Sequence, residues 1–356
     1  MIRVLVVDDS AFMRKALSMM LEKDDGITVL ATARNGKDAI NKVMNLKPDV
    51  VTMDVEMPQM DGISAVREIM DRQPLPILMV SSLTKDGAQT TVDALAAGAV
   101  DFIAKSSSFV ALDIKSIENE LIAKVKSVVR SRYFRNRSRR RHNADRQFRK
   151  KTDQVTVNAR NARLVAIGVS TGGPFALQKV LPELPGDFPV PIAIVQHMPP
   201  HFTRSLAERL NNMSALEVVE AEPGMQVCPG RAILAAGGKH LTFRAGVPHP
   251  IVRTSTRPTD SPHCPSVDVM FESAHQQFGG DVLALIMSGM GKDGLEGAQK
   301  LKDSGARILA QDEATSVVYG MPRAVAEAGL ADAVIPLHAL PGALTSSIGR
   351  RSASRA

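Results

Sequence analysis

The segment Gly168-Val169-Ser170-Thr171-Gly172 has the residue types and spacing of a serine nucleophile turn, G-x-S-x-G. The apolar run Leu164–Ile167 before it predicts a buried strand, and Pro174 suits the first turn of a following helix. Glycines allow a sharp turn, and backbone N–H groups at a helix N-terminus can bind an oxyanion. The motif indicates acyl-transfer chemistry, but a turn that merely connects or that cradles a phosphate has the same pattern.

A serine hydroxyl becomes a useful nucleophile when a histidine takes its proton and a carboxylate holds that histidine. His197 lies 27 residues after Ser170, about one βαβ unit, and follows the predicted strand Val190–Val195. Asp293 lies in the turn after a third predicted strand, Val282–Met287. Because parallel strands end at one sheet edge, these three residues are predicted to form a catalytic triad.

A competing set combines Ser170 with Asp268 and His275, in the order of α/β-hydrolases. Asp268 and His275 lie seven residues apart in one helical stretch, Val267–Gln276, rather than after separate strands. That placement disfavours them. The remaining histidines fall in predicted loops, the linker or the tail: His142, His201, His240, His249, His263 and His338.

A second group of reactive residues occurs early in the chain. Asp8 and Asp9 follow one predicted strand and Asp54 follows another, while Ser81 and Lys105 end two further strands. Three carboxylates at one sheet edge repel one another and need a hard divalent cation, for which Mg²⁺ is the best candidate. A nucleophilic aspartate facing that ion, with a lysine and a hydroxyl nearby, indicates a site for an aspartyl-phosphate.

These placements depend on two alternating patterns of strand and helix, one over residues 1–125 and one from Arg163 onward. Such alternation predicts an α/β fold with two doubly wound parallel sheets, the first flavodoxin-like and the second Rossmann-like. Ala232–Ala235 and His240–Arg244 flank Gly237-Gly238 and predict a hairpin. Further strands are predicted over Ile2–Val7, Thr28–Ala31, Val50–Met53, Ile77–Val80, Val100–Ala104 and Arg307–Ala310.

Length and composition narrow the class of protein. A chain of 356 residues is long enough for two domains, each with its own core. No apolar run approaches the ~20 residues of a membrane helix, and the N-terminus lacks a signal-peptide pattern. Cys228 and Cys264 are too few for a disulfide framework. We therefore expect a cytoplasmic protein without membrane insertion.

The net charge of +7 is concentrated in a linker. Residues 130–151 hold eleven Lys or Arg against one acid, Asp145, and have no hydrophobic period. We expect a hinge that contacts either an acidic partner or the other domain, and no nucleic-acid binding, because no recognition helix is evident. The predicted segments are 1–125, a linker over 126–160, a catalytic domain over 161–345 and a tail over 346–356.

The first half resembles response-regulator receiver domains. The matching segments are Val6–Ser10, Met53–Gly62 and Phe102–Lys105. The resemblance implies Asp54 as phosphoacceptor, with Asp8, Asp9 and the Glu56 carbonyl around Mg²⁺, Ser81 and Lys105 sensing the phosphate, and Phe102 as the aromatic that reorients. Ser106 departs from the usual proline after the lysine.

The second half resembles the catalytic domain of the chemotaxis protein-glutamate methylesterases, the CheB family. The matching segments are Ile167–Pro174, Gln196–Pro199, Pro265–Asp268, Ser288–Gly294, Gln311–Ser316 and Tyr319–Pro322. The resemblance implies Ser170 as nucleophile, His197 as general base and acid, Asp293 as orienting carboxylate, Thr171 as supporting residue and the Met290 backbone in the oxyanion hole.

The combined expectation is a methylesterase activated by phosphorylation. It would hydrolyse glutamate methyl esters on methyl-accepting chemoreceptors, deamidate receptor glutamines, and receive phosphate from a chemotaxis histidine kinase, with Mg²⁺ for phosphorylation and no cofactor for hydrolysis. Two other classes stay open. One is a response regulator whose second domain only binds a partner, and the other is a DNA-binding regulator that uses the basic linker.

Overall fold

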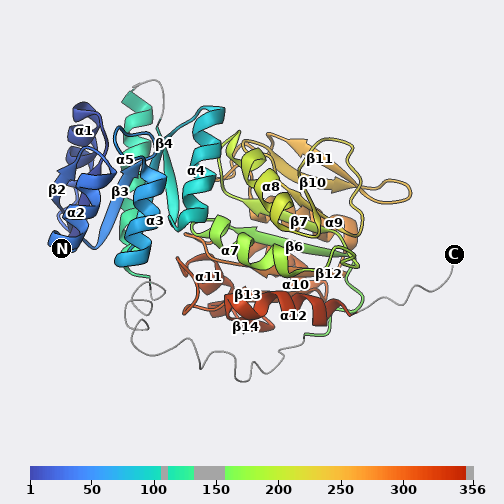
Figure 1. Cartoon of the computed structure of the whole chain (residues 1–356). Coiled ribbons are helices and arrows are strands. Elements are labelled where there is room, and N and C mark those ends of the chain that lie inside the picture. Colours follow the sequence, from blue (N-terminus) through green and yellow to red (C-terminus); the bar gives the residue numbers. More distant parts are fainter. Residues whose placement is uncertain (106–110, 132–156, 350–356) are drawn as a thin grey trace. The chain divides into compact units, whose positions relative to one another are not determined.

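The computed structural model describes residues 1–105, 111–131 and 157–349, and the chain divides into two compact units, residues 1–143 and 144–356. Each unit contains a parallel sheet with helices packed against it (Figure 1). The predicted α/β class with two parallel sheets is confirmed. Ser106, most of the basic linker and the tail from residue 350 lie outside the described residues, and the four predicted segment boundaries stay a prediction. Within the described ranges, no helix combines the length and apolar character needed to cross a membrane.

The first unit has a five-stranded parallel sheet in the order β2-β1-β3-β4-β5, the flavodoxin-like order. Helix α1 lies beside α5, while α3 lies beside α2 and α4, so helices cover both faces (Figure 1). The elements are β1 (Ile2–Val7), α1 (Ala11–Leu21), β2 (Ile27–Ala33), α2 (Gly36–Leu46), β3 (Val50–Asp54), α3 (Gly62–Arg72), β4 (Ile77–Ser82), α4 (Lys85–Ala97), β5 (Asp101–Lys105) and α5 (Ala111–Val129).

Local sequence explains where these elements begin. The residues Val4–Val7 are buried, as expected for a central parallel strand covered on both faces. A polar side chain caps each of the first four helices by accepting a backbone N–H from its first turn. The capping residues are Ser10, Asn35, Asp61 and Thr84.

The second unit has a seven-stranded parallel sheet in the order β14-β13-β12-β6-β7-β9-β8, and a two-stranded antiparallel ribbon, β10-β11. Its strands are β6 (Leu164–Val169), β7 (Ile192–Gln196), β8 (Glu217–Glu220), β9 (Arg231–Leu234), β10 (His240–Arg244), β11 (Ile251–Ser255), β12 (Val282–Ile286), β13 (Arg307–Gln311) and β14 (Ala333–Ile335). Its helices are α7 (Gly173–Val180), α8 (Phe202–Met213), α9 (Val267–Phe278), α10 (Leu295–Asp303), α11 (Met321–Glu327) and α12 (Leu340–Ile348), with short 3₁₀ turns η1 (Leu181–Glu183) and η2 (Leu337–Ala339).

The strand order makes β6 the point at which the chain changes direction across the sheet. Strand β7 pairs with one edge of β6, and β12, which comes much later in the sequence, pairs with the other. In doubly wound sheets, ligands bind outside the carboxyl ends of the strands at such a switch point. The residues that follow β6, β7 and β12 therefore occupy the favoured place for a site.

The predicted hairpin is wrong. Strand β9 pairs in parallel with β7 and β8 inside the main sheet, whereas β10 pairs with β11 in the separate ribbon. The residues Ala232–Leu234 are all buried, which suits a parallel strand covered on both faces better than a hairpin strand with one solvent face. The glycines between β9 and β10 thus separate two sheets rather than close one turn.

Candidate active site

Ser170 follows β6 directly and is held through its backbone. Its N–H donates to the Ser288 carbonyl (2.9 Å), and its own carbonyl accepts from Gly173 N (2.7 Å) and Gln196 Nε2 (3.0 Å). Gly172 has φ of +77°, and a Cβ there would lie 2.5 Å from the Val317 side chain. Glycine is therefore required at this corner, where the chain turns from β6 into α7.

His197 follows β7, and its side chain contacts Asp293. The residues Val169 and Gln196 pair at the ends of β6 and β7, so Ser170 and His197 leave the sheet side by side. His197 Nε2 lies 2.7 Å from Asp293 Oδ2. Among the described residues, the buried Nδ1 of His197 has no hydrogen-bond partner. When the Nε2–H group donates a hydrogen bond to Asp293, Nδ1 carries the lone pair that can accept a proton.

Asp293 receives three further hydrogen bonds from the start of α9. The Val267 N–H donates to Oδ2 (2.7 Å), and the Asp268 N–H (3.0 Å) and the Ser266 hydroxyl (2.9 Å) donate to Oδ1. Burial would raise the pKa of Asp293, but the His197 bond and charge and the helix N–H groups lower that pKa well below its ordinary value. Asp293 is therefore an anion that holds the His197 ring through Nε2.

The turn after β12 passes close to the serine. A Cβ built on Gly289 would lie 2.9 Å from Ser170 Cβ. The buried Ser288 hydroxyl donates to the Thr171 carbonyl (2.7 Å) and accepts from Val318 N (3.0 Å), which ties this turn to the serine turn. The predicted supporting residues Thr171 and Met290 thus lie in two loops that are joined next to Ser170.

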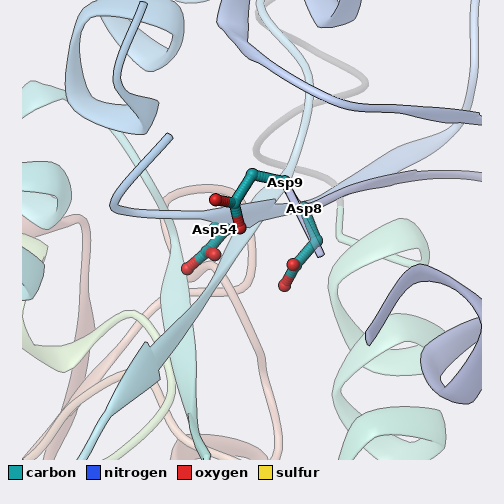
Figure 2. Close-up of side chains that lie close together, drawn as sticks. All are labelled: Asp8, Asp9 and Asp54. Atoms are coloured by element: carbon teal, nitrogen blue, oxygen red, sulfur yellow. The ribbon is translucent and has the colours of Figure 1, made fainter. Parts of the chain in front are cut away.

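The first unit brings three carboxylates together. Asp8 and Asp9 follow β1, Asp54 ends the neighbouring β3, and an oxygen of each lies within 4.8 Å of the others. Figure 2 shows these side chains gathered at the strand ends. Carboxylate oxygens are the ligands that Mg²⁺ prefers, and three of them in this space fit such an ion.

Lys105 balances part of this negative charge. Its Nζ lies 3.0 Å from Asp8 Oδ2 and 2.9 Å from Asp54 Oδ1. Burial raises the pKa of Asp54 to about 6, and the charge of Asp8 adds to the shift, while Lys105 partly offsets it. One lysine leaves the three carboxylates undercompensated, so they favour a bound cation.

Comparison with known proteins shows what this arrangement resembles. The family description "CheB methylesterase" matches residues 165–344, and "Response regulator receiver domain" matches residues 4–115. The chain belongs to the CheB methylesterase family. It is 47% identical to a protein-glutamate methylesterase/protein-glutamine glutaminase of Oleidesulfovibrio alaskensis over 98% of this chain and all of the relative. It is 48% identical to one of Nitratidesulfovibrio vulgaris, with the same coverage of both chains.

A solved structure supports the same assignment for the second unit. The CheB methylesterase catalytic domain of Thermotoga maritima is 43% identical and has a TM-score of 0.50. The match covers 51% of this chain and 97% of that domain. The second unit therefore corresponds to a domain whose structure has been solved as a separate piece.

The competing set for this CheB-family site is not assembled. Asp268 lies in the first turn of α9 and accepts a bond from the Gly297 N–H at Oδ1 (2.7 Å), whereas His275, in the last turn, has its Nδ1 3.0 Å from the Ser304 hydroxyl. Burial raises the pKa of Asp268 to about 6, with a further contribution from the charge of Asp293. Asp268 therefore lies beside Asp293, whereas His275 lies at the far end of the helix.

His263 is the site residue that the sequence pattern missed. Its ring stacks on His197 with the centroids 4.1 Å apart and the planes at 19°. Burial and the neighbouring His197 charge lower the pKa of His263. Buried His240 anchors the His263 loop, since its Nδ1 accepts from Ser266 N and its Nε2 lies 3.0 Å from the Pro258 carbonyl. No periodicity or motif marks this loop histidine in the sequence.

The remaining predicted receiver residues lie around the carboxylates. Ser81 is buried at the end of β4 and donates to the Gly87 carbonyl (3.1 Å), and Phe102 is buried in β5 with Lys124 Nζ 5.5 Å from its ring centroid. Glu56 is exposed in the loop after β3. Their roles in binding an ion or sensing a phosphate stay predictions.

Proposed function

We propose that this protein is a protein-glutamate methylesterase and protein-glutamine glutaminase that acts on methyl-accepting chemoreceptors and is activated by phosphorylation at Asp54. The observation that carries the proposal is the contact of His197 with Asp293 beside Ser170, at the switch point of the seven-stranded sheet. This sheet belongs to the part of the chain that matches the CheB methylesterase family. The match to relatives named for this activity, over almost the whole length of both chains, supports the substrate class.

In the proposed reaction, Ser170 Oγ attacks the side-chain carbonyl carbon of a methylated glutamate while His197 Nδ1 takes the hydroxyl proton. The carbonyl oxygen becomes an oxyanion, which the Met290 N–H stabilises, with the Thr171 loop beside it. The tetrahedral intermediate collapses, the C–O bond to methanol breaks, and the imidazolium donates its proton to the leaving oxygen. Asp293 stabilises the imidazolium during both transfers.

Deacylation repeats these steps with water as nucleophile. His197 Nδ1 takes a proton from water, the hydroxide attacks the acyl carbon, and the ester bond to Ser170 breaks as the serine oxygen regains its proton. The products are a free glutamate side chain and methanol. A glutamine substrate forms its own tetrahedral intermediate, whose C–N bond breaks as His197 protonates the leaving nitrogen; ammonia is released and the same acyl-enzyme remains.

For control by phosphorylation, the proposed phosphoacceptor is Asp54, with phosphate drawn from a histidine kinase. Asp8, Asp9, Asp54 and the Glu56 carbonyl would hold Mg²⁺, which when bound neutralises charge at the phosphoryl group. Lys105, already 2.9 Å from Asp54, adds a positive charge there. Ser81 and Phe102 would respond to the phosphorylated state.

The direct test measures methanol release from receptor membranes carrying labelled methyl esters, with and without acetyl phosphate. We expect the wild type to hydrolyse the esters and acetyl phosphate to accelerate the reaction. Ser170→Ala should lower the rate by several orders of magnitude, because triad members act as one unit. Ser170→Ala with more than a tenth of wild-type activity would contradict the serine mechanism. No methanol release from folded wild-type protein would contradict the esterase proposal itself.

A further inference from the structure

The segment Val318–Met321 runs alongside the turn that follows β12. Gly289 N donates to the Val318 carbonyl (3.0 Å), and the Gly289 carbonyl accepts from both Gly320 N (3.0 Å) and Met321 N (2.9 Å). Gly289 and Tyr319 form a parallel bridge. The peptide between Gly289 and Met290 is therefore held on one side by two backbone donors.

This contact determines where the Met290 N–H points. A trans peptide points its C=O and the following N–H in opposite directions, and Gly289 turns both its N–H and its C=O toward the Val318–Met321 segment. Ser288 O and the Met290 N–H therefore both point away from that segment. The Ser288 carbonyl accepts from Ser170 N, and the Gly289 carbonyl faces away, toward Gly320 and Met321. The Met290 N–H therefore points to the side on which Ser288 O bonds Ser170 N, and among the described residues it has no hydrogen-bond partner.

Ser170 cannot supply this donor itself, because its own N–H is bonded to Ser288 O. A donor on the turn after β12 can therefore serve the oxyanion in its place. Its usefulness depends on direction, since oxyanion donors act only when they are aimed at the developing charge.

Gly320 allows the two segments to approach this closely. A Cβ at this position would lie 2.7 Å from Gly289 O, 3.0 Å from Gly291 N and 3.2 Å from Met290 Cα. The φ of Gly320 is −103°, so an alanine there suffers no backbone strain. Glycine is therefore required here by the close contact and not by the backbone conformation. The atoms that an added methyl group would displace belong to the turn after β12.

We propose that Gly320 is a positioning residue for catalysis, which lets the Val318–Met321 segment clamp the Gly289 carbonyl and so aim the Met290 N–H at the substrate oxyanion. This inference rests on the proposed hydrolase function. A methyl group at position 320 pushes the turn away, turns the donor from the oxyanion, and leaves Ser170, His197 and Asp293 in place. The substitution therefore weakens stabilisation of the transition state and leaves substrate binding unchanged.

The test compares Gly320→Ala with Gly342→Ala, measuring kcat and KM on a methylated receptor and on p-nitrophenyl acetate. Gly342 is exposed in α12 and a Cβ there meets nothing within 4 Å, so its variant is the matched control. We expect Gly320→Ala to lower kcat about 10- to 100-fold with KM within about twofold of wild type. Gly342→Ala keeps both constants.

A second readout separates donor alignment from loss of folded protein. A boronic acid that forms a tetrahedral adduct with Ser170 should bind Gly320→Ala more weakly by about the same factor as kcat/KM falls, with unfolding temperature and active-site titre near wild type. An unchanged kcat, or an equal rise in KM alone, overturns the proposal. If Gly320→Ala does not fold, Ser288→Ala provides the test, because it removes the hydroxyl that bonds Val318 to the turn. It must then lower kcat without raising KM; an unchanged kcat would contradict the proposal.

The two substrates keep this inference distinct from the proposed function. If the wild type cleaves p-nitrophenyl acetate but not receptor methyl ester, the methylesterase proposal fails while the clamp is still tested on the small ester. If the wild type cleaves both and Gly320→Ala does so equally well, the clamp fails and the function stands. A wild type that cleaves neither overturns both.

Discussion

His197 Nε2 lies 2.7 Å from Asp293 Oδ2, so the carboxylate binds the ring nitrogen that in the Ser-His-Asp template faces the serine. The other nitrogen, Nδ1, is buried and has no partner among the described residues. In the proposed mechanism the two ring nitrogens therefore exchange roles, and Nδ1 is the base. The triad logic is preserved because either nitrogen can accept a proton once the other is held as a donor.

The first prediction concerns this tautomer. In Asp293→Asn, the amide can donate to Nε2, which moves the ring proton to Nδ1 and removes the lone pair that Ser170 needs. We expect kcat to fall about 10⁴-fold with a normal fold. Asp187→Asn, at an exposed position, controls for the loss of a carboxylate. Less than a tenfold loss for Asp293→Asn in a methanol-release assay would show that Asp293 does not orient His197.

The sequence predicted that Ser170, His197 and Asp293 lie together because each follows a strand, and the carboxyl ends of parallel strands meet at one edge regardless of the loops between them. The same reasoning predicted that Asp8, Asp9 and Asp54 lie together, and one carboxylate oxygen of each lies within 4.8 Å of the others. Long buried strands such as β6 and β12 were predicted nearly to their ends, because continuous apolar runs are a strong signal.

Features set by contacts distant in sequence could not be predicted in this way. Strand β9 joins the main sheet through pairing with β7, some forty residues earlier, so its flanking glycines suggested the wrong partner. The short strands β8 and β14 carry too few residues for a periodic signal. His263 reaches His197 only because His240 holds its loop. Such a contact is a property of packing, not of local pattern.

The second prediction separates stacking from charge at His263. Because burial lowers its pKa, His263 is neutral at neutral pH and acts on His197 through ring contact. His263→Phe should keep kcat within about threefold of wild type, whereas His263→Ala should lose about tenfold, as expected for an aromatic pair worth about 1.4 kcal/mol. Equal losses in both variants, measured with purified protein at saturating substrate, would show that the imidazole nitrogens are needed.

The third prediction concerns the pH dependence of stability at Asp268. Its pKa is raised by burial to about 6 in the folded protein, above its value in the unfolded chain. The folded state therefore holds an extra proton between about pH 4 and 6, and stability falls as pH rises through that window. Asp268→Asn keeps an oxygen for the Gly297 N–H and removes the titration.

The variant should unfold at the same temperature as wild type near pH 4 and at a higher temperature at pH 7. The gain at pH 7 should be about 1–2 kcal/mol after allowance for solvent screening. Unfolding is followed by circular dichroism, with Asp187→Asn as control. A variant less stable than wild type at pH 7 would show that the Asp268 carboxylate is a net stabilising group.

The last prediction asks whether the receiver blocks or assists the catalytic unit. A fragment that begins near residue 153 retains Ser170, His197 and Asp293 together with the hydrogen bonds that hold them in place. If the receiver only limits access, this fragment should hydrolyse methylated receptor faster than the unphosphorylated full-length protein. A phosphodonor should leave the fragment's rate unchanged. Asp54→Asn in the full chain should stay at the basal rate with donor, because it lacks the nucleophilic carboxylate.

The comparison must be made at saturating substrate, because the fragment also lacks the basic residues of the linker and can bind an acidic receptor surface less tightly. A population shift from mostly closed to mostly open requires about 5 kcal/mol of differential stabilisation. A dianionic phosphoryl group next to Lys105 can supply part of it. A fragment slower than the unphosphorylated parent at saturation would mean that the receiver helps to form the active conformation, and an inhibitory gate would then be the wrong description.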